Sequence, residues 1–421
     1  MTRILLVATT TGYQIRSFGE AAVKLGIELV VASDRCDHLD DPWRDGAIAV
    51  RFHDREASVR AVQSALADRP VQGVVAVGDR PAVFAAAVAS ALGLPGNSAE
   101  AAERSRNKLL TRRALQAVGL SVPRFSLVLP DASPAPASAH VAYPAVVKPL
   151  ALSGSRGVIR VDDAAGCAAA VERVRRLLLA PDVGEERDPA HGYILIESFI
   201  PGREKAVEGV LVDGRLQTFA IFDKPDPLDG PFFEETIYVT PSSEPLEVQA
   251  AITAAIATAA QGLGLDHGPI HAECRVNEQG IYVLEVAPRP IGGLCARALR
   301  FTTASEAEAS LEEVLLRHAL GQDVGSVVRE APAAGVMMIP IPRRGVFRGV
   351  GGVENARAVP GVLDVRITAK TDALLVPLPE GRSYLGFIFA RAGEPSEVIA
   401  ALRAAQQRLQ FRIDKEVPVI P

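Results

Sequence analysis

Residues 270–293 read IHAECRVNEQGIYVLEVAPRPIGG. Two runs of strand-forming residues, each with one glutamate (Glu273 and Glu285), flank the segment Asn277-Glu278-Gln279-Gly280, which predicts a tight turn. A three-residue loop with its glycine at positive φ would place the two glutamates opposite each other, with Cβ atoms roughly 5 Å apart. A two-residue turn would place them on opposite faces of the hairpin, where both would be solvated.

Like charges that face each other destabilise a β-sheet, so a facing pair needs a compensating cation. A divalent cation held by carboxylate oxygens is the simplest one. Arg289 follows Glu285 by four residues and could hold a third, anionic group. Metal, anion and carboxylates together indicate phosphate chemistry, but a hairpin alone does not decide between a metal site and two solvated carboxylates.

The composition is that of a well-packed globular protein, since 48% of the 421 residues are hydrophobic and 23% are charged. A chain of this length predicts more than one domain. The net charge of −5 argues against a general nucleic-acid binder, and we see neither a membrane-spanning run nor a signal peptide. The four cysteines are scattered and form no CxxC pair. We therefore expect a cytoplasmic protein without disulfides, a zinc site, or a nucleic-acid or membrane partner.

Lysine is rare in this chain. Of 45 basic residues only seven are lysines, at positions 24, 108, 148, 205, 224, 370 and 415. Because arginine supplies the ordinary positive charge here, a lysine at an interior-looking position is a candidate for a compact charge on a phosphate.

Residues 1–95 alternate apolar strand-like runs with helical stretches, which predicts a parallel sheet covered by helices on both faces. The expected strands are residues 4–8, 27–32, 47–52 and 73–77. The loop Thr9–Gly12 could bind an anion at a helix start or could be a plain turn. It lacks GxGxxG, so a dinucleotide site is unsupported.

Residues 96–325 predict a two-lobed unit, with a small lobe over about 120–196 and a large lobe over about 197–325. We expect one helical region over 99–118, a surface loop over 130–144 and an exposed loop over 223–231. Residues 326–421 then predict a small α+β domain. Its Arg343, Arg344 and Arg348 could reach a site in the preceding unit or could form a solvated basic loop.

Four features follow each other in the order that phosphate chemistry would use. Lys148 ends an apolar strand, and the small-residue loop Ser153-Gly154-Ser155-Arg156-Gly157 follows it. Backbone N–H groups of such a loop can wrap phosphate oxygens. Residues 197–204 then indicate a hinge between two lobes, and the hairpin with its arginine comes last. A plain turn could explain the glycine loop alone, but the ordered set indicates a nucleotide site.

With these motifs the sequence resembles the ATP-grasp superfamily over about residues 1–325. The resemblance implies an ATP-grasp fold, α/β and α+β, in which a parallel-sheet domain precedes two lobes that hold ATP and Mg²⁺ or Mn²⁺. It also implies site residues, which we list by role. The expected ATP contacts are Lys108, Lys148, Ser153, Gly154, Ser155, Gly157, Glu197, Phe199, Ile200 and Glu204. The expected metal ligands are Glu273 and Glu285, and the expected catalytic residues are Arg289 and Lys148.

Within the superfamily the chain looks most like the L-amino-acid ligases, because of Phe233-Glu234-Glu235-Thr236, the EVAPRPIGG run and the C-terminal part. The resemblance implies small-molecule carboxylate and amine substrates, and it leaves open whether the chain forms a homodimer. Two departures stand out. Ala287 occupies a position where many relatives have an asparagine metal ligand, and Ile237-Tyr238 replaces a Gly-His pair, so acceptor specificity does not carry over.

We therefore expect an ATP-dependent carboxylate–amine ligase that works through an acyl phosphate and releases ADP and phosphate. The alternatives are the same fold with a carboxylase or purine-type acceptor, and an ATP-binding module without turnover. The candidate substrate residues are Glu235, Tyr238, His271, Gly292 and Gly293. Glu235 could bind a substrate ammonium or lie in solvent at the rim, and His271 could support the site or be structural. Cys274 is expected in the core.

Overall fold

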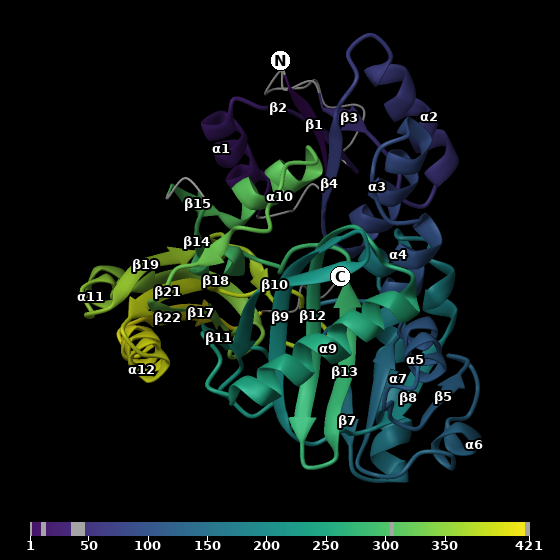
Figure 1. Cartoon of the computed structure of the whole chain (residues 1–421). Helices are drawn as coiled ribbons and strands as arrows, with labels where there is room; N and C mark the ends of the chain where they lie inside the picture. The colour runs from purple at the N-terminus through teal and green to yellow at the C-terminus, as the bar shows by residue number, and fades with distance from the viewer. Residues whose placement is uncertain (1, 10–13, 35–46, 304–306, 417–421) are drawn as a thin grey trace.

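The computed structural model describes residues 2–9, 14–34, 47–303 and 307–416. An N-terminal unit lies at the top of Figure 1, a central unit lies below it, and the C-terminal region (yellow) lies on the left. No helix within these described ranges has the length and apolarity needed to cross a bilayer.

The described residues of the N-terminal unit form a four-stranded parallel sheet in the order β3-β2-β1-β4. The central strand β1 (Arg3–Ala8) is buried along nearly its whole length, as expected for a strand covered on both faces. The predicted parallel αβα arrangement is therefore confirmed. The remaining elements are α1 (Ile15–Leu25), β2 (Glu28–Ser33), β3 (Ile48–Ala49), α2 (Arg55–Leu66), β4 (Gly73–Val77) and α3 (Asp79–Leu92). Of the predicted Thr9–Gly12 loop, residues 10–12 lie outside the described residues.

The helical region expected at 99–118 is two helices, α4 (Ala99–Arg106) and α5 (Lys108–Ala117). Asn107 adopts an extended backbone between them, and its side chain accepts hydrogen bonds from the N–H groups of Leu109 and Leu110 at 3.1 and 3.3 Å. This N-cap starts a new helix and places Lys108 at its first position.

The small lobe is an antiparallel sheet in the order β5-β8-β6-β7 with α7 packed against it. A short helix, α6, lies inside the segment predicted as a surface loop. The elements are β5 (Phe125–Val128), α6 (Ala135–Ser138), β6 (Ala145–Pro149), β7 (Ile159–Val161), α7 (Ala164–Leu178), α8 (Pro181–Gly184), η1 (Pro189–Gly192) and β8 (Ile194–Ser198).

In the described part of the chain the large lobe belongs to an eight-stranded sheet with the order β13-β12-β9-β10-β11-β17-β21-β19. The large lobe supplies β9 (Arg203–Val212), β10 (Arg215–Asp223), β11 (Ile237–Thr240), β12 (Gly268–Asn277) and β13 (Gly280–Ala287). Helix α9 (Leu246–Leu263) crosses β9, β12 and β13 in Figure 1 and buries Ile252, Ile256 and Leu263.

The same sheet continues into the C-terminal region, because β11 pairs with β17 (Ala333–Ile339) through Tyr238 and Val336. The boundary expected near residue 326 remains a proposal about domain organisation, since hydrogen bonds of one sheet cross it. The other elements after β13 are η2 (Cys295–Ala298), β14 (Arg300–Thr302), β15 (Glu308–Ser310), α10 (Leu311–Ala319), β16 (Val328–Arg329), β18 (Gly345–Gly351), α11 (Val353–Arg357), β19 (Val362–Ile367), β20 (Leu374–Leu375), β21 (Gly386–Ala392), α12 (Pro395–Gln406) and β22 (Gln410–Asp414).

In the β12–β13 hairpin the turn differs from the predicted one, but Glu273 and Glu285 still face each other as predicted. Asn277 pairs with Gly280, so the turn has two residues, and the three-residue loop is wrong. The register then shifts beyond the Cys274–Val283 pair, where Leu284 is an extra residue, and Glu273 pairs with Glu285. A β-bulge moves every later residue to the other face. The bulge therefore produces the facing carboxylates that the turn alone would have separated.

Candidate active site

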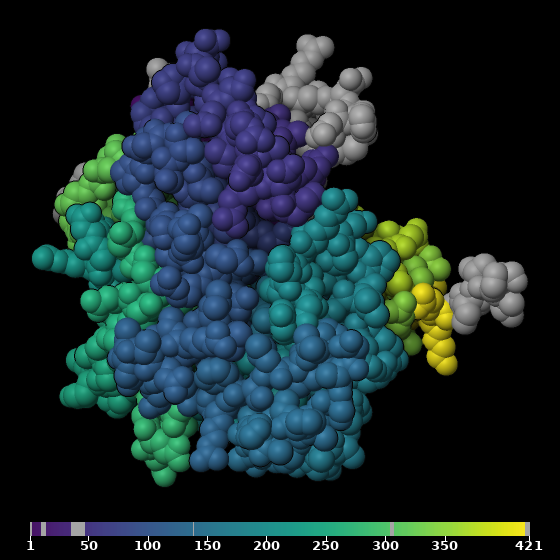
Figure 2. All heavy atoms as spheres, turned by 90° about the vertical axis from the view of Figure 1, so that its right-hand side faces the viewer, coloured from purple at the N-terminus to yellow at the C-terminus, as the bar shows by residue number. Residues whose placement is uncertain are grey.

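One cavity of about 830 Å³ opens between the N-terminal unit, both lobes and the C-terminal region. Figure 2 shows the atoms of the N-terminal unit (purple) above those of the small lobe (blue) and places C-terminal residues (yellow) at one edge. All the predicted site residues except Gly157 line this cavity. They come from segments up to 185 positions apart, counted from Lys108 to Gly293, so the fold brings together what the sequence disperses.

Lys148 and Arg112 share the carboxylate of Glu197 in the cavity wall. Arg112 Nε and Nη2 donate to its two oxygens at 2.9 and 3.2 Å, and the Lys148 ammonium contacts Oε1. Burial raises the pKa of a carboxyl group, but Arg112 and Lys148 hold that of Glu197 at about 2. Burial lowers the pKa of Lys148 to about 8 in spite of Glu197. Two cations on one carboxylate leave a net positive charge that suits an anionic ligand.

Lys108 brings a second ammonium group to this wall. Its Nζ donates to the backbone oxygen of Leu152 at 2.7 Å, and its own N–H donates to Leu150 O at 3.0 Å. Burial lowers the pKa of Lys108, while Glu285 and Asp79 oppose that shift. The start of α5 is thereby attached to the strand end from which the small-residue loop begins.

The glycine loop, residues 153–158, rests on the C-terminal region. Gly157 N–H donates to Pro379 O at 2.8 Å, and Arg156 Nε donates to Glu380 O at 2.9 Å. Gly154, Ser155 and Gly157 have positive φ, which makes room for a tight loop. Ser153 and Gly154 are exposed to the cavity, whereas Gly157 is buried beneath the C-terminal segment.

The backbone groups of Phe199 and Ile200, which were expected to contact the adenine of ATP, make hydrogen bonds within the protein. Phe199 N–H donates to Pro144 O at 2.8 Å, and Ile200 O accepts from Arg275 Nη1 at 2.6 Å. The Phe199 ring stacks on Phe233 with centroids 6.2 Å apart, which gives this end of the cavity an apolar wall. A carbonyl oxygen has two lone pairs, so Ile200 O retains one for a ligand.

A buried lysine lies under the acidic floor of the cavity. The Lys224 ammonium is 2.8 Å from Glu204 Oε1, 2.5 Å from Glu235 Oε1 and 2.7 Å from Glu273 Oε1. Burial would lower the pKa of Lys224, but the three carboxylates raise it well above its usual value. Ligand atoms of the three glutamates lie within 4.8 Å of one another, so Lys224 occupies the place that a cation would take among them.

Glu235 and Glu273 have pKa values shifted in opposite directions although both contact Lys224. Burial and the neighbouring Glu273 raise the pKa of Glu235 to about 7, and the Tyr238 hydroxyl donates to it at 2.7 Å. Lys224 and His271 hold the pKa of Glu273 well below its usual value, although burial alone would raise it. Near neutral pH Glu235 can carry a proton while Glu273 remains ionised.

His271 pairs with a buried carboxylate. Its Nδ1 is 2.5 Å from Glu208 Oε1, and its Nε2 is 3.8 Å from Glu273 Oε1. Burial would lower the pKa of His271, but Glu208 raises it to about 9. The imidazolium therefore adds positive charge beside Glu273 and lines the cavity.

Arg289 joins the hairpin to the N-terminal unit. Its Nε donates to Asp79 Oδ1 at 2.7 Å, and its Nη2 is 3.5 Å from Glu285 Oε1. Asp79 and Glu285 raise the pKa of Arg289, which burial would lower. Asp79 is the first residue of α3, so the N-terminal unit contributes directly to this end of the cavity. Ala287 is buried and adds no ligand atom.

Five charged residues of the site had no role predicted from the sequence: Lys224, Arg112, Asp79, Glu208 and Arg275. The rarity of lysine in this chain could have marked Lys224 as a candidate site residue. The prediction of an exposed loop over 223–231 concealed it, and that prediction is wrong for Asp223, Lys224 and Leu228, which are buried. Cys274 is buried as predicted.

The three arginines of the C-terminal region do not line the cavity. Arg343 donates to Ile413 O, Arg344 pairs with Glu416 at 2.6 Å and Arg348 pairs with Asp414 at 2.7 Å. The alternative of a basic surface loop describes them correctly.

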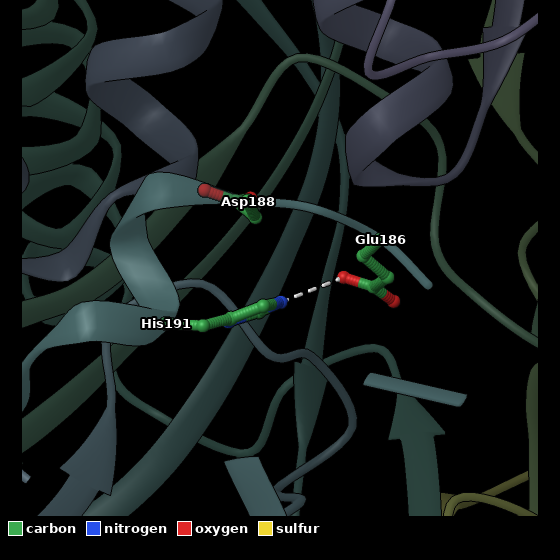
Figure 3. A group of neighbouring side chains, drawn as sticks. All are labelled: Glu186, Asp188 and His191. Atoms are coloured by element: carbon green, nitrogen blue, oxygen red, sulfur yellow. Dashed lines mark hydrogen bonds and ion pairs between the residues drawn. The ribbon is translucent and has the colours of Figure 1, made fainter. Parts of the chain in front are cut away.

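A second acidic group lies at the edge of the cavity (Figure 3). The His191 ring points at the Glu186 carboxylate, 3.2 Å away, with Asp188 beside them. Asp188 is 2.5 Å from Arg106, and Glu186 is 3.5 Å from Arg80. Because arginines take up both carboxylates, the group joins the small lobe to the helices above it.

Comparison with known protein families matches three parts of the chain. An ATP-grasp N-terminal domain matches residues 19–96, an ATP-grasp domain matches residues 141–298, and L-amino acid ligase C-terminal domain 2 matches residues 337–414. The chain belongs to the ATP-grasp superfamily. The predicted ATP-grasp fold is thus confirmed, and the matched C-terminal domain is that of the L-amino-acid ligases.

Individual ATP-grasp relatives agree with this. The crystal structure of an L-amino acid ligase from Bacillus licheniformis is 26% identical, covers 99% of both chains and superposes with a TM-score of 0.79. Carnosine synthase 1 of Gallus gallus is 30% identical over 51% of this chain and 24% of its own length. Alanine–anticapsin ligase of Bacillus amyloliquefaciens is 28% identical over 48% of this chain and 44% of its own length. The chain thus spans less than half of these two curated relatives.

ATP and Mg²⁺ are the cofactors of ATP-grasp enzymes. The residues present fit them: the cavity has the volume of a small-molecule site and combines two lysines with a small-residue loop. Glu273 and Glu285 face each other across the hairpin and would supply the hard oxygen ligands that Mg²⁺ takes.

Proposed function

We propose that this chain is an ATP-dependent ligase that joins a carboxylate to an amine, with amino acids as its small-molecule substrates. The observation that carries the proposal is the gathering of both lysines, the glycine loop, Arg289 and two facing glutamates around one cavity. The likeness to an L-amino acid ligase over nearly the whole of both chains supports it.

A carboxylate is a poor electrophile, so it must be activated before an amine can attack it. Bound ATP supplies the phosphoryl group that makes an acyl phosphate, and bound Mg²⁺ neutralises phosphate charge. Lys108, Lys148 and the N–H groups of the glycine loop would hold the phosphates, and Glu273 and Glu285 would hold the metal. Arg289, fixed by Asp79, would stabilise charge on the transferred group.

The second half of the reaction forms the amide. The substrate ammonium first loses one proton to solvent, and the free amine nitrogen then bonds to the acyl carbon as the carbon–oxygen bond to phosphate breaks. The second proton passes from the nitrogen to the released phosphate. Ionised Glu235, which accepts a hydrogen bond from the Tyr238 hydroxyl, would bind a substrate ammonium. Contacts of the glycine loop with the C-terminal region would exclude water from the acyl phosphate.

The test is release of ADP and phosphate from ATP in the presence of pairs drawn from the twenty amino acids, with the product identified by mass spectrometry. We expect turnover with particular pairs and a dipeptide product. Glu285→Gln should abolish turnover while a fluorescent ATP analogue still binds, because one metal ligand is lost. Glu278→Gln in the exposed hairpin turn is the matched control and should behave as the parent.

Three results would contradict the proposal. Turnover with bicarbonate or a purine precursor would place the chain with the carboxylase-type alternative. ATP binding without release of ADP by any pair would favour a binding module. Full turnover by Glu285→Gln would remove the metal assignment.

A cytoplasmic location is a further proposal, which rests on the scattered cysteines, and a homodimer is the second arrangement to test beside a monomer. Fractionation of cells that express the protein would test the first, and light scattering coupled to size-exclusion chromatography would test the second.

A further inference from the structure

The segment 379–384 of the C-terminal region forms part of the cavity wall. Its first two residues hold the glycine loop through the Gly157–Pro379 and Arg156–Glu380 backbone contacts. The Glu380 carboxylate also receives both Nε and Nη2 of Arg173, at 2.5 and 2.9 Å. Its last three residues, Arg382, Ser383 and Tyr384, line the cavity. The segment is therefore anchored on one side and presents side chains to a ligand on the other.

Arg382 differs from the other cations of the cavity wall. Lys148 contacts Glu197, Arg289 contacts Asp79, and the remaining lysines and arginines of the wall likewise have protein partners. Among the residues that the structure describes, Arg382 alone of these cations makes no hydrogen bond or ion pair. Arg156, whose Nη1 lies 2.8 Å from the Asp182 carboxylate, and the charge of Arg382 both lower the pKa of Asp182, so Arg382 has an acidic neighbour but no direct ion pair with it.

The cavity next to Arg382 suits the body of an amino acid. Tyr384 stands two residues further on, and its ring packs against Phe387 with centroids 6.3 Å apart. Phe387 lies so close to Gly293 that a Cβ there would be 3.0 Å from its ring. Glu235 acts electrostatically on Tyr384, so an acidic group borders the same aromatic surface. The cavity therefore offers Arg382 to the carboxylate of an amino acid, Glu235 to its ammonium group, and the aromatic rings to a small or apolar side chain.

Two substrate carboxylates take part in the reaction, and only one of them needs an arginine outside the phosphate-binding residues. The carboxylate that becomes activated must lie with the transferred phosphate, near Arg289 and the glutamates of β12 and β13. The carboxylate of an amino acid that supplies the amine keeps its negative charge through the reaction. A guanidinium outside the phosphate-binding set can hold it by two parallel hydrogen bonds.

We propose that Arg382 binds the free carboxylate of the amine-donating amino acid and so sets the preference for a free acid over its amide at that site. The inference rests on the ligase function proposed above and assigns the residue that holds this carboxylate in the second substrate site. Arg382 acts as a specificity-determining residue that never contacts the activated carbonyl.

The experiment compares free acids with their amides as amine donors. The probes are glycine, L-alanine, L-leucine and L-phenylalanine, each against the matching amide, with the acid substrate and ATP held at saturation. We expect the parent to prefer the free acids. Arg382→Gln should raise KM for the free acids about tenfold to a hundredfold, with kcat and the KM for ATP little changed, and should abolish the preference. Arg382→Lys should recover part of it, since a point charge replaces the planar fork.

Arg408→Gln is the matched control, since Arg408 is an exposed arginine of the same region outside the cavity. It should leave all parameters unchanged, and thermal unfolding should show that the Arg382 variants remain folded. Equal use of acids and amides by the parent would overturn the inference and leave the ligase function intact. A rise confined to the KM for ATP would assign Arg382 to phosphate instead. A parent that releases no ADP with any probe or amino-acid pair removes both proposals.

Discussion

The ammonium of Lys224 lies 2.7 Å from a carboxylate oxygen of Glu273. Glu204 and Glu235 reach the same ammonium, and all of these side chains are largely withdrawn from water. A buried cation among three carboxylates fixes the positions of all three. Lys224 thus orients the proposed metal ligand Glu273 and the proposed substrate residue Glu235 without lining the cavity itself.

Lys224→Met should lower the free energy of unfolding by about 3–5 kcal/mol, because it leaves buried carboxylates without their cation. Urea unfolding at pH 8 measures this, with Lys370→Met at an exposed lysine as the control. The loss should be smaller at pH 5, since buried carboxylates without a partner take up protons. An equal loss at both pH values would contradict the electrostatic explanation.

The lowered pKa of Glu197 predicts that the free energy of unfolding falls in acid. Its pKa is about 2 in the folded protein, against an ordinary value of 4.5. A lowered pKa stabilises the fold above pH 4.5, and that contribution of about 3 kcal/mol is lost as the pH falls from 4.5 towards 2. Urea unfolding from pH 6 to pH 3 should show this slope in the parent.

In Glu197→Gln the slope should be reduced and stability at pH 6 should be lower, since Arg112 and Lys148 lose their shared counter-ion. Glu278→Gln in the exposed turn should keep the parental slope. A parental slope in Glu197→Gln would show that other carboxylates cause the acid dependence.

Substitution by alanine should destabilise the fold more at Gly157 than at Gly154. Both Gly154 and Gly157 have positive φ, so alanine costs about 1–2 kcal/mol at either position. A Cβ at Gly157 would also lie 2.9 Å from Leu177 Cδ2, whereas Gly154 has open space around it. Gly157→Ala should therefore lower the thermal midpoint more than Gly154→Ala, and equal midpoints would show that the packing around residue 157 is loose.

Arg156 predicts a link between the C-terminal region and nucleotide binding. Arg156→Met removes the hydrogen bond to Glu380 O and the ion pair with Asp182, so the glycine loop should become more mobile. Affinity for a fluorescent ATP analogue should fall about tenfold, and limited proteolysis within residues 153–158 should accelerate. Arg176→Met, at an exposed arginine of α7, serves as the control. Unchanged affinity would mean that the loop holds its shape without the C-terminal region.

Much of the fold is predictable from local pattern. The apolar runs of β1, β4 and β6 and the helices between them follow hydrophobic periodicity and glycine stops, which act within a few residues. Asn107 shows where this fails. A capping side chain splits one helical pattern in two, because the hydrogen bond that Asn107 Oδ1 accepts from the Leu109 N–H group outweighs continuation of the helix.

The candidate site was predictable where residue types carry the chemistry and not where packing does. Lys108, Lys148, Glu273, Glu285 and Arg289 stand out because few other residue types can hold phosphate or metal. Arg112, Glu208 and Lys224 do not, since a charged residue in a strand or helix is usually exposed, and only the assembled sheet shows that these are buried and paired.

The sequence by itself determined the order of the units, their strands and helices, and the residue types that phosphate chemistry requires, because each depends on neighbours in the chain. The tertiary structure decided the rest. It alone shows the bulge at Leu284 that turns Glu285 towards Glu273, the sheet that runs on from β11 into β17, and the free guanidinium of Arg382 at the cavity. These depend on hydrogen bonds and burial between segments far apart in the chain, which no local pattern encodes.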